Sequence, residues 1–167
     1  CSSSGAETTC ERIEPNACPN LVSGENIITS CGIERTVRIR LPQSHSQQGR
    51  YKTVLLFHGI NADQVDDIEE DTAMNRLVDP FDFILISPYS RRLAIEWDQG
   101  RPGDNPDVAL VDDLLTCAQQ TLGADPERLY LAGDSGGGMF TTFLVSQFAE
   151  TVAAAAINSG GIIFDMP

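Results

Sequence analysis

The stretch from Arg128 to Phe140, RLYLAGDSGGGMF, joins two different patterns through a serine flanked by glycines. Before the serine, Leu129 to Ala132 form a short apolar run, which is typical of a buried strand. After it, the sequence favours a helix that begins at Ser135. A serine in Gly-x-Ser-x-Gly at a tight strand-to-helix turn is typical of a nucleophile elbow, which projects the hydroxyl above the strand ends.

The chemistry of such a turn depends on its glycines and on the start of the helix. Gly133 and Gly137 leave room where the strand and the helix crowd together. The first helical turn offers unpaired N–H groups and the positive end of the helix dipole. We therefore predict that Ser135 is a nucleophile and that the N–H of Gly136 stabilises an oxyanion. The alternative is that Ser135 only caps the helix.

The rest of the chain alternates strand patterns with helix patterns. Ile33 to Leu41 alternates apolar and polar residues, interrupted only by Arg35, which predicts a half-buried strand, and continuous apolar runs predict buried strands. The expected strands are 33–41, 54–57, 83–86, 129–132 and a strand within 151–161, and the expected helices are 64–78, 107–122 and one from 135. This order predicts a single α/β domain, a three-layer sandwich with a mostly parallel central sheet.

Composition excludes several classes of function. The chain has 167 residues and a net charge of −13, which argues against nucleic acid because a phosphate-binding face needs clustered Lys and Arg. The sequence contains no apolar run long enough for a transmembrane helix. No Cys-x-x-Cys or Cys–His pair has the spacing of metal ligands, so we expect no metal and no other cofactor.

Residues 1–30 read as an N-terminal tether with cysteines, and residues 31–167 as the folded domain. Cys1 and the small polar residues after it look like the start of a mature bacterial lipoprotein, lipidated on Cys1, which would anchor an exported protein to a membrane. An arbitrary start at Cys1 is the alternative. The other four cysteines allow three disulfide connectivities, and we predict a Cys18–Cys31 bond.

The string GDSGG also surrounds the nucleophile of chymotrypsin-like proteases. His58, Asp107 and Ser135 even follow that family's chain order of histidine, aspartate and serine. However, the interval from Asp107 to Ser135 is too short, and that fold consists of two β-barrels. The alternation of strands and helices therefore argues against it.

From about Cys31 to Gly161 the sequence resembles the α/β-hydrolase family of polyhydroxybutyrate depolymerases, feruloyl esterases and acetyl xylan esterases. The matching segments are ERTVRIRLP, TVLLFHGINA, FDFILISP, IEWDQG, DVALVDDLL and DPERLYLAGDSGGGMFTTFL. The resemblance implies an α/β-hydrolase fold and an exported serine esterase without a cofactor. Its substrate would be a polyester or a polysaccharide-linked acyl group, cleaved through an acyl-enzyme on Ser135.

The resemblance also assigns the loop that follows LLFHG. It implies that the N–H of Ile60 is the second oxyanion donor, with Asn61 as the next candidate. His58 would be structural, with its ring tied to nearby backbone, and a role as general base is the alternative. His45 lies in a polar turn and is expected at the surface.

Two further residues are candidates for substrate binding together with Asn61. Trp97 falls in the tryptophan-bearing loop of the family, near the substrate mouth, but it could equally be a packing residue. Asp134 departs from the family, which often has a small or polar residue there, and it adds charge beside the nucleophile.

The family's triad runs in the chain order serine, acid, histidine. The acid and the histidine would therefore follow Pro167, so we expect the sequence to hold only the N-terminal part of the fold. The alternative is a short chain that is inactive or is completed by another polypeptide. The apolar strand within 151–161 would then lie at an exposed sheet edge. A non-catalytic α/β-hydrolase-like binding lipoprotein and a serine peptidase of the same fold are the alternative functions.

Overall fold

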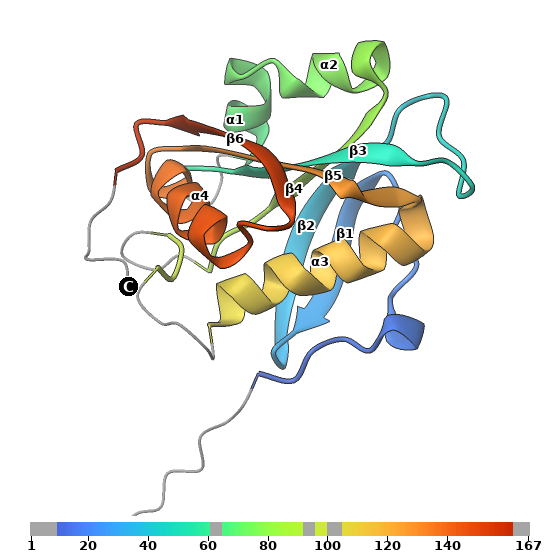
Figure 1. Cartoon of the computed structure of the whole chain (residues 1–167), viewed down its shortest axis with the longest axis horizontal. Helices are drawn as coiled ribbons and strands as arrows, with labels where there is room; N and C mark the ends of the chain where they lie inside the picture. The colour runs from blue at the N-terminus through green and yellow to red at the C-terminus, as the bar shows by residue number, and fades with distance from the viewer. Residues whose placement is uncertain (1–9, 61–64, 92–95, 100–104, 162–167) are drawn as a thin grey trace, which may run out of the picture.

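A computed structural model describes residues 10–60, 65–91, 96–99 and 105–161 of the chain. It has a central six-stranded sheet with helices on both faces (Figure 1). In chain order the elements are η1 (Pro15–Ala17), β1 (Gly24–Ser30), β2 (Ile33–Arg40), β3 (Tyr51–Phe57), α1 (Val65–Asp71), α2 (Met74–Phe81), β4 (Phe83–Pro88), α3 (Pro106–Leu122), β5 (Ala124–Asp134), α4 (Gly136–Gln147) and β6 (Val152–Asn158).

The strands lie in the order β1-β2-β4-β3-β5-β6. β4, β3, β5 and β6 are parallel neighbours, whereas β2 is antiparallel to both β1 and β4. The predicted α/β class with a mostly parallel sheet is therefore confirmed. Parallel neighbours also bring the carboxyl ends of β3, β4 and β5 to one edge of the sheet, where the candidate site lies.

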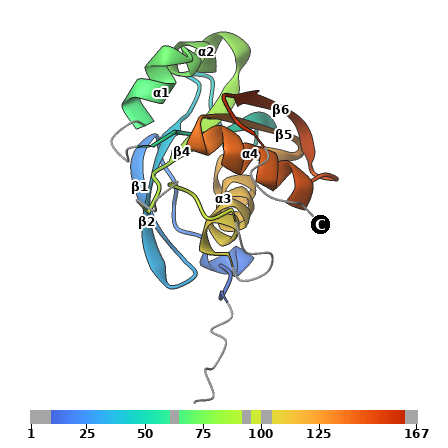
Figure 2. The ribbon, with the colours of Figure 1, turned by 90° about the vertical axis from the view of Figure 1, so that its left-hand side faces the viewer.

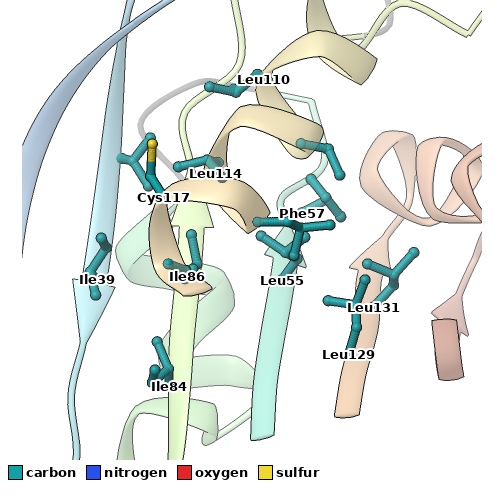
Figure 3. Close-up of a cluster of buried hydrophobic side chains, with 14 of the residues drawn as sticks. Ile39, Leu55, Phe57, Ile84, Ile86, Leu110, Leu114, Cys117, Leu129 and Leu131 are labelled. Carbon is teal, nitrogen blue, oxygen red and sulfur yellow. The ribbon is translucent and has the colours of Figure 1, made fainter. Parts of the chain in front are cut away.

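The two faces of the sheet have separate hydrophobic cores. α3 and α4 cover one face, and α1 and α2 cover the other (Figures 1 and 2). Because side chains alternate along a strand, neighbouring residues of β3 pack into the cores on opposite faces of the sheet. Phe57 faces α3 and α4, in the larger core shown in Figure 3, and Leu56 packs with Ile68 of α1 on the other face.

α3 begins and ends where its sequence signals predict. The side chain of Asn105 accepts hydrogen bonds from the N–H groups of Asp107 and Val108, and Pro106 occupies the first helical turn. Gly123 ends the helix with a positive φ of 68°, and its N–H bonds back to the carbonyl of Ala118. These signals fix the N-terminus of α3, which carries Asp107.

The single helix predicted over 64–78 is wrong, because the structure has two helices there. Ala73 has a φ of 54°, a left-handed conformation that interrupts the helical hydrogen bonds between α1 and α2. α2 also continues past the predicted end, to Phe81. It stops where Asp82 turns left-handed and its N–H bonds back to the carbonyls of Val78 and Asp79.

The N-terminal segment 1–30 contributes to the sheet, which the sequence did not predict. β1 pairs with β2 along its whole length and forms one edge of the described sheet. At the opposite edge, β6 is apolar but exposed along residues 153–158. The interpretation of β6 as a buried strand is wrong, whereas its expected place at an exposed edge is confirmed.

The predicted Cys18–Cys31 bond is also wrong. The described residues instead contain Cys10–Cys31 and Cys18–Cys117 disulfides. The reason is that the fold brings Cys18 to Cys117 of α3, so that Cys10, earlier in the same segment, is the partner of Cys31. The segment before β1 lies beside α3, where the N–H of Ile13 donates to Asp113.

No helix among the described residues is both long enough and apolar enough to cross a membrane.

Candidate active site

Ser135 lies at the turn between the last residue of β5 and the first residue of α4. Its backbone has a φ of 52° and a ψ of −117°. A non-glycine residue with a positive φ is rare and strained, and such strain persists only where the surroundings impose it. Ser135 is partly exposed, so the strained turn presents its hydroxyl at the carboxyl edge of the sheet.

Two glycines make this turn possible. A Cβ on Gly133 would lie 2.3 Å from the carbonyl oxygen of Gly137, and a Cβ on Gly137 would lie 2.0 Å from the carbonyl oxygen of Phe57. Real Cβ atoms do not approach backbone oxygens so closely. The start of α4 is therefore packed directly against the ends of β5 and β3, as the sequence predicts for this motif.

Asn158, at the end of β6, holds the turn from the other side. Its carbonyl accepts a hydrogen bond of 3.0 Å from the N–H of Ser135. Its side-chain Nδ2 donates to Oδ1 of Asp134 at 2.6 Å. Asp134, a candidate for substrate binding, thus has one carboxylate oxygen engaged by the neighbouring strand.

The loop after β3 reaches the same place. A Cβ on Gly59 would lie 3.1 Å from the Cβ of Ser135 and 3.6 Å from its Oγ. Ile60 follows and is 53% exposed. The structure therefore brings the predicted donor segments, at Gly136 and at Gly59–Ile60, to Ser135. Asn61 lies outside the described residues.

His58 is buried, and both of its ring nitrogens have backbone partners. The N–H of Ser90 donates to Nε2 at 3.1 Å, so the ring proton is on Nδ1, which donates to the carbonyl of Gly59 at 2.7 Å. Burial lowers the pKa of His58, which favours this neutral form. The ring is thus tied to nearby backbone, as expected for a structural histidine.

His45 lies far from Ser135. Its Nε2 is 3.0 Å from the carbonyl oxygen of Leu122, at the end of α3, and its ring stacks on Tyr51, the first residue of β3. This is the amino end of the parallel strands, opposite to the Ser135 turn. Neither of the two histidines in the sequence is therefore placed to accept the proton of Ser135.

Trp97 is fully buried, which favours packing over direct substrate contact. Its indole stacks on Phe140, with ring centroids 5.2 Å apart, and meets Phe57 edge-on. Its Nε1–H donates to the carbonyl of His58 at 2.9 Å. Trp97 therefore supports the backbone beside Ser135 from within the core.

Sequence reasoning missed the buried ion pair between Arg35 and Asp107. The side chains of both residues are almost fully buried, and the Arg35 guanidinium donates to Asp107 at 2.8 Å. Arg35 also donates to the carbonyl of Tyr89 at 3.1 Å. The one available signal was the position of Arg35, a charged residue on the apolar side of β2.

An open hollow of about 560 Å³ adjoins the turn on the face covered by α1 and α2. Gly59, Gly133, Asp134 and Asn158 line it near the turn, and Asp67, Glu70 and Asp71 line it from α1. Within the described part of the chain, no cluster of three or more His, Cys, Asp or Glu residues could hold a metal ion.

The sequence of the chain matches a family of esterases and is similar to two curated esterases. Residues 28–162 match the family described as "Putative esterase". The bifunctional acetylxylan esterase/xylanase XynS20E of Neocallimastix patriciarum is 31% identical over 112 residues, which are 66% of this chain and 16% of that protein. Feruloyl esterase D of Neurospora crassa is 24% identical over 148 residues, 85% of this chain and 51% of that protein.

The fold is also that of solved esterase structures. The acetyl xylan esterase from Aspergillus awamori superposes with a TM-score of 0.67 at 19% identity, covering 81% of this chain and 51% of that one. The expected α/β-hydrolase fold is therefore confirmed. The chain spans about half the length of this structure and of feruloyl esterase D.

Proposed function

Because the chain belongs to the family described as "Putative esterase", we propose that it hydrolyses carboxylic esters through an acyl-enzyme on Ser135. The observation that carries the proposal is the strained φ of 52° at Ser135, at a strand-to-helix turn faced by the backbone of Gly59. A tight turn of this kind, with a helix N-terminus on one side and a glycine loop on the other, suits a serine nucleophile.

The proposed reaction has two steps. Ser135 Oγ attacks the ester carbonyl carbon and loses its proton to a general base, while the N–H groups of Gly136 and Ile60 stabilise the oxyanion. The alcohol leaves with a proton, and water then attacks the acyl-enzyme and releases the acid. The base has to be a group other than His45 or His58, because both rings are already engaged elsewhere.

We propose acyl groups on a polyester or a polysaccharide as the substrate class. The names of the similar acetylxylan and feruloyl esterases support the polysaccharide branch. The hollow beside Gly59 and Asp134 offers space for an acyl or alcohol group.

We also propose export to an oxidising compartment. The Cys10–Cys31 and Cys18–Cys117 disulfides, which stabilise the N-terminal segment, support this because disulfides form and persist in such compartments. A lipid anchor on Cys1 remains a proposal from the sequence alone, because Cys1 lies outside the described residues.

The experiment is hydrolysis of p-nitrophenyl acetate by the full-length protein and by its Ser135→Ala variant. Wild type should turn over and should react with a fluorophosphonate at Ser135, whereas the variant should do neither. Ser146→Ala is the matched control, since Ser146 lies on α4 and its hydroxyl bonds only within that helix among its described contacts, to the carbonyl of Phe143 and with the side chain of Gln147. Activity that survives Ser135→Ala would refute the proposal.

The same experiment separates the alternative functions. A non-catalytic binding lipoprotein predicts that neither hydrolysis nor fluorophosphonate labelling occurs in the folded full-length protein. A serine peptidase predicts labelling of Ser135 together with faster cleavage of peptide substrates than of esters.

A further inference from the structure

The two carbonyls of the Gly59 loop are both held by side chains. The carbonyl of His58 accepts from Trp97 Nε1 at 2.9 Å, and the carbonyl of Gly59 accepts from the His58 ring at 2.7 Å. A trans peptide unit is planar, so its N–H points opposite to its C=O. Holding these two carbonyls therefore fixes the directions of the N–H groups of Gly59 and Ile60.

Trp97 is itself held, both through its ring and through the residue that follows it. Its ring is fixed by Phe57 and Phe140. The next residue, Asp98, is bonded through its backbone: its N–H donates to Asp107 Oδ2 at 2.8 Å, and its carbonyl accepts from Asn105 Nδ2 at 2.8 Å. The start of α3 thus determines where the Trp97 segment lies.

Asp107 is the centre of this arrangement. Its carboxylate is fully buried and accepts from Arg35 at 2.8 Å and from Arg91 at 3.2 Å through Oδ1. A buried carboxylate is costly unless it is paired and hydrogen-bonded, and these partners, with the Asp98 N–H, meet that requirement. The carboxylate orientation is therefore set by three separate elements of the fold.

We propose that Asp107, acting through Trp97, is a positioning residue for the Gly59–Ile60 loop: Trp97 holds the His58–Gly59 peptide unit, and the Ile60 N–H, in the peptide unit that follows it, is the proposed oxyanion donor. The inference rests on the proposed function, since it concerns the oxyanion donor of that reaction. Asp107 makes no contact with Ser135 among the described contacts. Its effect passes from the Asp98 N–H to the Trp97 indole, then to the His58 carbonyl and the next peptide unit.

A positioning role differs from a structural ion pair in what it does to kinetics. An oxyanion forms only during the reaction, so a misdirected donor lowers kcat and leaves KM nearly unchanged. A structural role would lower stability without this selective loss of kcat. The two roles can therefore be separated in a folded variant.

The test uses p-nitrophenyl acetate hydrolysis by the full-length protein. Trp97→Phe keeps an apolar ring but removes the Nε1–H donor, and we expect kcat to fall by roughly 10- to 100-fold with KM little changed. Tyr51→Phe is the matched control. It removes a polar group from another buried aromatic ring, bonded to Ser46 and Ser44 at the opposite end of β3, and should leave kcat unchanged.

A double-mutant cycle tests the route. Asp107→Asn should also lower kcat, and most of that loss should disappear when Trp97 is already Phe, because both changes affect the same donor. If Asp107→Asn fails to fold, the test is the comparison of kcat between the Trp97→Phe and Tyr51→Phe variants. An unchanged kcat in Trp97→Phe, or losses that simply multiply in the double variant, would overturn the inference.

The Ser135→Ala variant makes the two kinds of failure distinguishable. If wild type is inactive, or if Ser135→Ala remains active, the proposed function fails and the inference falls with it. If activity depends on Ser135 but not on Trp97, only the inference fails.

Discussion

The N–H of Ser135 donates a 3.0 Å hydrogen bond to the carbonyl oxygen of Asn158, which ties the strained turn after β5 to the end of β6. The same carbonyl oxygen lies 2.5 Å from where a Cβ on Gly138 would be. Asn158 is thus confined between the turn and the first residues of α4. Any residue larger than glycine at position 138 would act on Ser135 through Asn158.

We expect Gly138→Ala to lower both stability and ester hydrolysis. Alanine within a helix normally stabilises by about 0.5–1 kcal/mol relative to glycine. Here the added methyl group would press on a backbone oxygen, and such overpacking costs about 1–3 kcal/mol. The net expectation is a loss of about 1–2 kcal/mol in urea denaturation, with a lower rate of fluorophosphonate labelling at Ser135.

The matched control for this prediction is Gly161→Ala. A Cβ on Gly161 would have no neighbour within 4 Å, so stability and labelling should stay at wild-type values. A Gly138→Ala variant as stable and as reactive as Gly161→Ala would show that Asn158 does not transmit the change.

The buried His58 ring predicts a dependence of stability on pH. Burial lowers the pKa of His58 below its ordinary value of 6.5, so the unfolded chain binds a proton there more readily than the folded chain. The folded state is therefore favoured at neutral pH and loses stability as pH falls below about 6.5. Thermal unfolding between pH 5 and pH 8 should show this, and an NMR titration should give His58 a pKa below 6.5.

A substitution separates His58 from other acid effects. His58→Asn removes the titrating group, so its loss of stability between pH 8 and pH 5 should be smaller than in wild type. Equal slopes in the variant and in wild type would contradict the role given to His58.

Much of the fold was predictable because its signals are local. The apolar runs that became β3 and β4 need no distant contact to be recognised, and the turn at Ser135 is encoded within a few residues. β1 was missed because its buried side chains include the polar Asn26 and Ser30, whereas Ile27 is 64% exposed. Asn26 bonds to the backbone of Val22 and Ser30 to Asp113, so polar groups occupy inward positions and the apolar alternation is lost.

The support around the candidate site was not predictable from local pattern. The Trp97 bond to the His58 carbonyl spans 39 positions of sequence, and the Arg35–Asp107 pair spans 72. Such pairs form only when the fold brings β2, β3 and α3 together. The disulfide prediction was wrong for the same reason, since Cys18 finds its partner on α3, 99 positions away.

The two disulfides should stabilise the fold unequally. In the loop-entropy description, a bond that closes a longer loop stabilises more, about 5 kcal/mol for the separation of 99 between Cys18 and Cys117 and about 3 kcal/mol for the separation of 21 between Cys10 and Cys31. We expect the Cys18→Ala/Cys117→Ala double variant to lose more stability in urea than Cys10→Ala/Cys31→Ala does.

Reduction of the wild-type protein provides the control for the disulfide prediction. With dithiothreitol, the stability of the wild-type protein should fall at least to that of the less stable double variant. Without dithiothreitol, both double variants should be less stable than wild type. Equal losses in the two double variants would contradict the ranking by loop length.

Thr53 on β3 offers a stabilising substitution. Its side chain is buried, and its hydroxyl oxygen has no hydrogen-bond partner among the described residues. An unsatisfied buried hydroxyl costs about 1–3 kcal/mol, so Thr53→Val should raise the free energy of unfolding by about 1 kcal/mol.

Thr141→Val is the matched control. The buried Thr141 hydroxyl donates to the carbonyl of Gly137 at 2.8 Å, so its loss should destabilise by a similar amount. Urea denaturation of both variants checks the prediction, which fails if Thr53→Val and Thr141→Val change stability in the same direction.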